Sequence, residues 1–115
     1  MNLEVTILSN LVYSEKYARK VLPFLKSEYF TAREYKIVFL EIHEYISQYD
    51  SLPSLNALGI ECQERTDLTE EQYKEVVGVL NILSDDPSDH DWIVNTTEKW
   101  CQERAIYLSL MESVK

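Results

Sequence analysis

Glycine and proline are scarce in this sequence, which has two glycines and three prolines among 115 residues. The two glycines, Gly59 and Gly78, stand far apart, so the chain lacks the GxxxxGKS/T loop that cradles nucleotide phosphates. Valine- and threonine-rich alternating runs are missing too, whereas leucine, glutamate, lysine, tyrosine and isoleucine are abundant. The composition therefore predicts an all-α fold and argues against nucleotide hydrolysis by this chain.

Long apolar runs are also lacking, and cysteines are few. No stretch approaches the roughly 20 apolar residues of a membrane span, and the first four residues lack the basic start of a secretory signal. We therefore expect a soluble, cytoplasmic protein with no membrane partner. Cys62 and Cys101 form no CxxC motif, so reduced, partly buried thiols are expected rather than a disulfide or a metal site.

Positive charge is in the minority, with eleven basic against twenty acidic residues and a formal net charge of −9. Such a balance repels a phosphate backbone, so we expect no direct nucleic-acid binding. One local exception is a basic cluster with interleaved tyrosines, formed by Lys16, Arg19, Lys20, Lys26, Tyr13 and Tyr17. It is interpreted as a solvated face, with a contact to nucleic acid or an acidic partner as the alternative.

Apolar periodicity and capping residues predict a compact head of five or six helices over residues 1–88. A first helix ends near Tyr13, Ser14 caps a second one, and Ser27 starts a single turn. Thr31 and Glu34 predict a capping box at the start of the central helix. The expected buried face of that helix comprises Tyr35, Val38, Phe39, Ile42, Tyr45, Ile46 and Tyr49.

Two shorter helices complete the predicted head. Ser54 caps a helix over residues 55–63 whose apolar residues are Leu55, Leu58 and Ile60. Thr69 and Gln72 form another capping box, which opens a helix with the apolar face Tyr73, Val76, Val77, Leu80 and Leu83.

Two clusters of possible metal ligands are present: Glu41, His43 and Glu44, and Asp86, Asp89, His90 and Asp91. In the first, His43 follows Glu41 by two residues instead of the three of a Glu-x-x-His motif, so these side chains are interpreted as exposed. In the second, a helix start explains the carboxylates without a metal. We therefore predict no catalytic residue, no metal and no cofactor in this chain.

The C-terminal run predicts one long helix over residues 89–115, about 40 Å in length, with Ser88 as its N-cap. Ile93 and Trp92, near its start, are expected to pack on the head. An apolar stripe continues beyond them, and its later members predict an intermolecular contact. The candidate oligomer interface comprises Trp100, Arg104, Tyr107, Leu108, Met111 and Val114. Because no glycine, asparagine or proline closes this helix, we expect the chain to be part of a longer protein.

Several short segments, in order, resemble one known family. They are Ile7-Leu8-Ser9-Asn10-Leu11, Ser27-Glu28-Tyr29-Phe30, Pro53-Ser54-Leu55-Asn56-Ala57-Leu58, Asp86-Pro87-Ser88-Asp89-His90-Asp91-Trp92, Thr97-Glu98-Lys99-Trp100 and Arg104-Ala105. Together they resemble the N-terminal domain of the DnaB-type hexameric replicative DNA helicases, most closely its T-even-type phage branch. The glycine pair of many bacterial members is replaced here by Asp67-Leu68-Thr69-Glu70, which fits the phage branch better.

The resemblance implies a helical head followed by a hairpin, of which residues 89–115 would be the truncated first arm. Hairpins of this family pair as dimers, three dimers form a collar in the hexamer, and primase docks on that collar in the primosome. The ATPase motor, with its ATP and Mg²⁺, would follow residue 115, so no catalytic residue is carried over. The resemblance thus implies a non-catalytic collar domain of an ATP-dependent DNA helicase. The alternative is a free-standing acidic helical adaptor that binds a host or phage protein.

Overall fold

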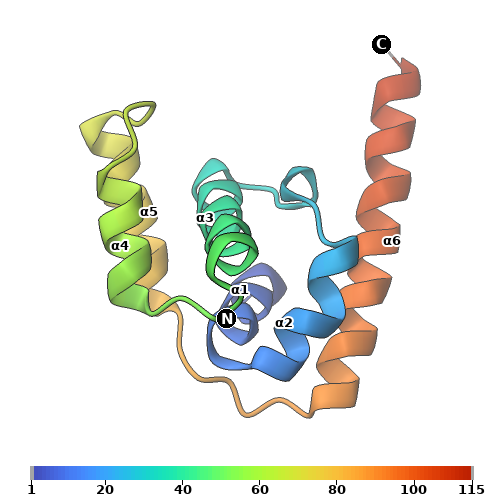
Figure 1. The fold of residues 1–115 in the computed structure, drawn as a ribbon. Coiled ribbons are helices and arrows are strands. Elements are labelled where there is room, and N and C mark those ends of the chain that lie inside the picture. Colours follow the sequence, from blue (N-terminus) through green and yellow to red (C-terminus); the bar gives the residue numbers. More distant parts are fainter. Residues whose placement is uncertain (1, 115) are drawn as a thin grey trace.

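The computed structural model describes residues 2–114, and within this range every regular element is helical. The α-helices are α1 (Leu3–Tyr13), α2 (Glu15–Val21), α3 (Arg33–Tyr49), α4 (Leu55–Gln63), α5 (Glu70–Ile82) and α6 (His90–Val114). Two single 3₁₀ turns, η1 (Leu22–Phe24) and η2 (Ser27–Tyr29), lie between α2 and α3 (Figure 1). The predicted all-α fold with a long last helix is confirmed.

The helices are arranged around α1 and α3, which lie in the middle of the molecule (Figure 1). The α4–α5 pair packs against α3 on one side, and α2 followed by α6 covers the other side. This arrangement places the α4–α5 pair and α6 at opposite edges of the fold. None of the helices within residues 2–114 has both the length and the apolar character needed to cross a membrane.

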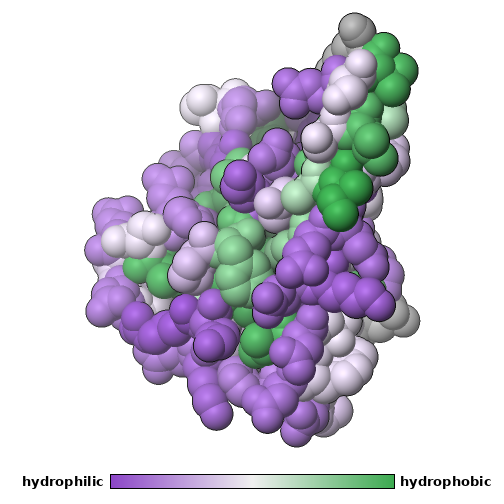
Figure 2. Space-filling view, turned by 90° about the vertical axis from the view of Figure 1, so that its right-hand side faces the viewer, coloured by the Kyte–Doolittle hydropathy of each residue, from purple (hydrophilic) through white to green (hydrophobic). Residues whose placement is uncertain are grey.

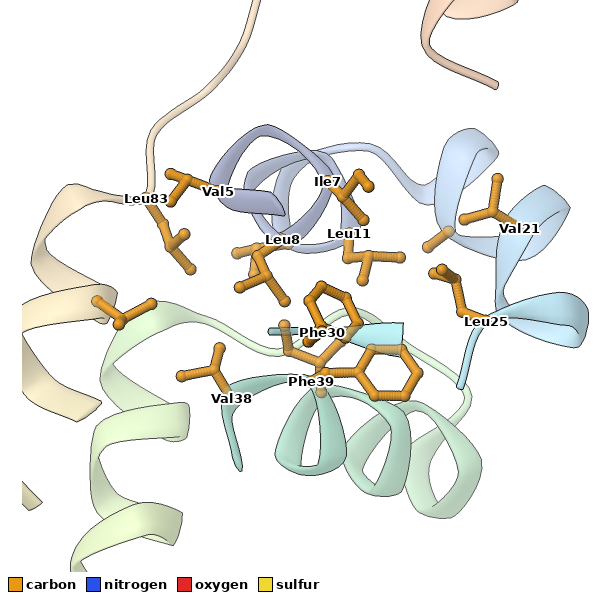
Figure 3. Packing of buried hydrophobic residues seen from close by; sticks show 14 of the residues in the cluster. Val5, Ile7, Leu8, Leu11, Val21, Leu25, Phe30, Val38, Phe39 and Leu83 are labelled. Atoms are coloured by element: carbon orange, nitrogen blue, oxygen red, sulfur yellow. The ribbon is translucent and has the colours of Figure 1, made fainter. Parts of the chain in front are cut away.

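The hydrophobic core lies between α1 and α3 and is centred on Phe30, as Figure 3 shows. Leu8 and Leu11 of α1 approach Phe30 from one side, while Phe39 of α3 stacks against it at a ring distance of 5.2 Å. All of these side chains are at most 2% exposed. Phe30 directly follows η2, so its burial in the core fixes the position of η2. The 3₁₀ turn η2 also contacts α6.

Three of the predicted helix starts are confirmed by the hydrogen bonds that their caps accept. The hydroxyl oxygens of Ser14 and Ser54 accept bonds from the backbone amides three residues later, at 3.2 and 3.0 Å. Thr69 and Gln72 form the predicted capping box, with bonds of 3.1 and 3.0 Å. These local signals work because both bonding partners lie within one turn of helix.

Two other predicted caps are wrong. Thr31 forms no capping box with Glu34, because its amide and hydroxyl both donate to the carboxylate of Glu4 on α1, each at 2.8 Å. The last helix begins one residue later than Ser88 predicts. Its N-cap carboxylate belongs to Asp89, which accepts a bond from the Trp92 amide at 3.1 Å.

The predicted exposure of Glu41 is also wrong, because this residue is 7% exposed. Its carboxylate accepts from the Arg65 guanidinium at 2.7 Å, and Arg65 also pairs with Asp67 at 2.8 Å. The network ties the loop after α4 to α3. Tyr49, which belongs to the predicted buried face of α3, is instead 55% exposed, and Ile60, an apolar residue of α4 that was available for burial, is 51% exposed.

Candidate interaction surface on the last helix

The first half of α6 packs on the head and fixes the direction of the helix. Ile93, Val94, Thr97 and Cys101 are buried on the side that faces α2 and η2. The Thr97 hydroxyl lies 2.6 Å from the Tyr17 hydroxyl of α2 in a fully buried pair. Burial also raises the pKa of Tyr17, so its hydroxyl stays protonated and able to donate. The expected burial of Ile93 is confirmed, whereas Trp92 is 54% exposed and was predicted wrongly.

The middle of α6 is fixed to η2 by an aromatic and a charged side chain. Trp100 packs edge-on against Tyr29 and Phe30, at ring distances of 6.2 and 5.1 Å. Arg104, one turn further on, donates from Nε to the Tyr29 carbonyl oxygen at 2.6 Å. The same guanidinium lies 5.0 Å from the ring centre of Tyr107, a cation–π contact. Trp100 and Arg104 therefore hold α6 on the head, and Arg104 also contacts the Tyr107 ring.

Beyond Arg104, α6 extends past the rest of the fold and carries a continuous apolar stripe. Figure 2 shows this apolar surface along the projecting end of the helix. Its large side chains are between 48% and 83% exposed; the apolar stripe, as we call it below, comprises Ile106, Tyr107, Leu110, Met111 and Val114. Exposed apolar side chains gathered on one face are typical of a surface that contacts another protein.

The structure divides the six residues predicted for the oligomer interface into two groups. Trp100, Arg104 and Leu108 are half-buried, and Trp100 and Leu108 pack against the core of their own chain. Tyr107, Met111 and Val114 are exposed and belong to the apolar stripe.

Sequence reasoning missed two members of the stripe, Ile106 and Leu110, each 62% exposed. The prediction followed residues seven apart. The spacing of four between Ile106, Leu110 and Val114 would have identified the additional face.

The basic cluster on α2 is interrupted by packing and by ion pairs. Tyr17, one of its tyrosines, is fully buried. Arg19 pairs with Glu15 at 2.9 Å and with Asp50 at 3.0 Å, both exposed carboxylates. These contacts favour the interpretation of a solvated face over that of a nucleic-acid site.

The two cysteines lie in different parts of the core as buried, free thiols. Burial raises the pKa of Cys62 to about 11 and that of Cys101 to about 12. Both are therefore protonated at neutral pH, and a protonated thiol is a poor nucleophile and metal ligand. Within residues 2–114, no group of three or more His, Cys, Asp or Glu side chains is placed to hold a metal ion.

The loop between α5 and α6 is fastened to α1 by polar side chains. Asn10 donates from its amide to the Asp86 carboxylate at 2.9 Å, and the Ser84 amide donates to the Ser9 hydroxyl at 3.2 Å. Hydrogen bonds from Ser88 and Asn10 lower the pKa of the Asp86 carboxyl from its ordinary value of 3.8. Asp86 therefore helps to position α6, and Asp89 caps it.

No protein-family model matches the chain. Over 101 residues, which are 88% of the chain, it is 40% identical to a "DnaB-like replicative helicase" of Enterobacteria phage T4. The chain is homologous to part of that replicative helicase. The aligned region spans 21% of the relative's length, which is consistent with an N-terminal domain. The resemblance to DnaB-type helicases seen in the sequence is thereby confirmed.

Proposed function

We propose that this chain is the non-catalytic N-terminal collar domain of a phage replicative DNA helicase, where it mediates subunit association and primase docking. The homology to a DnaB-like helicase supports the replication context. The observation that carries the assembly role is the apolar stripe of α6, which extends beyond the head and which the rest of residues 2–114 leaves about half exposed or more. The geometry favours pairing because Arg104 and Trp100 hold the stripe at a fixed direction.

The proposal includes the partners and cofactors of the whole protein. Stripes of two subunits pair in a dimer, and three dimers form the hexamer, on which primase docks. The collar itself contacts no nucleic acid and no membrane, and ATP and Mg²⁺ act in a motor domain of the full-length protein. The net charge of −9 supports the absence of direct DNA contact, because it opposes the approach of phosphates.

The assembly role is tested by placing charges in the stripe of a fragment that carries the head and the complete hairpin. The double substitution Tyr107→Asp with Met111→Asp should reduce the mass measured by light scattering to that of one subunit, because buried unpaired carboxylates oppose apolar contact. Circular dichroism should stay unchanged, since both side chains are exposed. Gln102→Asp with Ser109→Asp adds the same charge outside the stripe and is the matched control. An unchanged mass in the first variant would refute the assigned surface.

The alternative of a free-standing acidic adaptor is distinguished by the reading frame. A frame that continues after residue 115 into a second hairpin arm and a phosphate-loop ATPase excludes the adaptor. A stop codon at that point excludes the collar.

A further inference from the structure

The α4–α5 pair lies at the edge of the fold opposite α6 (Figure 1). A second apolar surface lies there, in a groove lined by residues of both helices. The groove has a volume of about 520 Å³ and is open to solvent. Its apolar lining comes from both helices, with Leu55, Gly59 and Ile60 on α4 and Tyr73, Val77 and Leu80 on α5. Side-chain amides complete the lining, and no charged residue contributes to it.

The two sides of α4 differ in what covers them. Leu58 and Cys62 are at most 1% exposed and face the core of the chain. Ile60 lies on the groove side and is 51% exposed, although it is as apolar as the buried residues. The helix thus has a second apolar side that the rest of residues 2–114 leaves uncovered.

Gly59 makes the groove deeper than any other residue at this position would. It lies inside α4, where glycine weakens a helix, and its backbone needs no positive φ. A Cβ built at this position meets no atom from elsewhere in residues 2–114 within 4 Å. The packing of the chain therefore does not require glycine here, whereas close approach of another backbone does benefit from it.

The two helices that line the groove, together with the loop that joins them, carry a net negative charge. Residues 55–82 contain six acidic side chains and two basic ones, Arg65 and Lys74. Arg65 is already paired with Glu41 and Asp67. An apolar groove with this surround is complementary to a helix that carries apolar residues on one side and lysine or arginine beside them.

We propose that the α4–α5 groove binds a basic amphipathic helix of a partner protein. The apolar side of that helix occupies the space over Gly59, and its cations lie against the acidic residues around the groove. This inference rests on the proposed docking role and deepens it, because it assigns the docking surface and the chemistry of the partner.

The test uses a synthetic helical peptide of leucine and lysine at helical spacing as the probe. Glycine amides occupy a distinct region of a nitrogen–proton NMR spectrum, and this chain has two glycines. On titration with the peptide, the amide signal of Gly59 should shift. The amide signal of Gly78 should not, because Gly78 lies on α5 outside the groove lining. A peptide with glutamate in place of lysine should produce no shift at the same concentrations.

Two matched substitutions test whether the groove itself binds. Gly59→Met fills the groove and should weaken binding at least tenfold. Gly78→Met introduces the same side chain into the neighbouring helix and should leave affinity unchanged, because Gly78 is not part of the groove lining. Both replace glycine inside a helix by a better helix former, so both variants should fold.

Three outcomes would overturn the inference: equal affinity in the two variants, equal binding of the glutamate peptide, or Gly59 shifts that depend on protein concentration without peptide. The last would identify a second copy as the occupant. The variant Tyr107→Asp with Met111→Asp should retain peptide binding. Self-association that survives those two substitutions, with intact groove binding, would refute the proposed stripe and leave the groove supported.

Discussion

Both halves of α6 contain large apolar residues, but those of the first half are mostly buried and those of the second half are mostly exposed. Ile93 in the first half is 1% exposed, whereas Ile106 in the second half, on the same helix, is 62% exposed. The first half lies against α2 and η2, and the second extends beyond them (Figure 1). Helical periodicity therefore indicates which residues share a face, but the length of the neighbouring elements decides which face is covered by the chain itself.

The two halves of α6 also differ in the direction in which their apolar side chains point. At 100° per residue, the middle of the apolar stripe is rotated by roughly a third of a turn from the middle of the side of α6 that faces the head. Leu108 remains on the head-facing side and is half-buried, whereas Leu110 is on the stripe. The stripe is thus a separate surface, and one α6 can contact its own head and another protein at once.

The contrast between the halves is tested most directly by a pair of isoleucine substitutions. Ile93→Ala should lower the free energy of unfolding by about 3 kcal/mol, because it leaves a cavity in a closed core. Ile106→Ala should change it by less than about 0.5 kcal/mol, since the side chain is exposed in the single subunit. Urea denaturation at concentrations where the protein is monomeric measures both. Equal losses would show that the second half is also covered by its own chain.

The packing of the first half of α6 on α2 is tested by removing the buried hydroxyl pair of Tyr17 and Thr97. Tyr17→Phe should lower the free energy of unfolding by about 1–2 kcal/mol, because the Thr97 hydroxyl loses its partner in a buried site. Adding Thr97→Val should cost less than the sum of the two single changes. A double-mutant cycle by urea denaturation measures the coupling, and strict additivity would contradict the contact.

The smallest expected effect concerns the loop that leads into α6. Because hydrogen bonds lower the pKa of Asp86 in the folded state, its contribution to stability is present above pH 3.8 and is lost as the pH falls through the folded value. Asp86→Asn should therefore reduce the loss of stability between neutral pH and about pH 3. The exposed neighbour Asp85 supplies the control, Asp85→Asn. A pH profile of Asp86→Asn that matches the unmutated chain would refute this attachment.

Much of the fold could be predicted from the sequence because its signals are local. Ser14, Ser54 and Thr69 each cap a helix through an amide three residues away, so the sequence contains both partners side by side. The failures involve distant partners. Thr31 bonds to Glu4, 27 residues away, and Glu41 pairs with Arg65, 24 residues away, and no periodicity indicates either contact.

The candidate site could be predicted only in part for the same reason. Tyr107, Met111 and Val114 follow from helical spacing, but the cover over Trp100 comes from η2, far away in the sequence. The groove over Gly59 was not predicted, because a glycine in a short helix indicates neither a cavity nor a partner by itself. Its meaning depends on α5, which packs beside α4.

The bond from Arg104 to the Tyr29 carbonyl has a mechanical consequence. It lies where α6 leaves the head, and the helix continues unbroken for ten further residues, to Val114. A hydrogen-bonded helix bends little over three turns, so the tip acts as a lever whose fulcrum is η2. Because Trp100 on the same helix contacts Phe30, the core also fixes the angle at which the tip projects, and pairing of two such tips would set the spacing and tilt of the two heads.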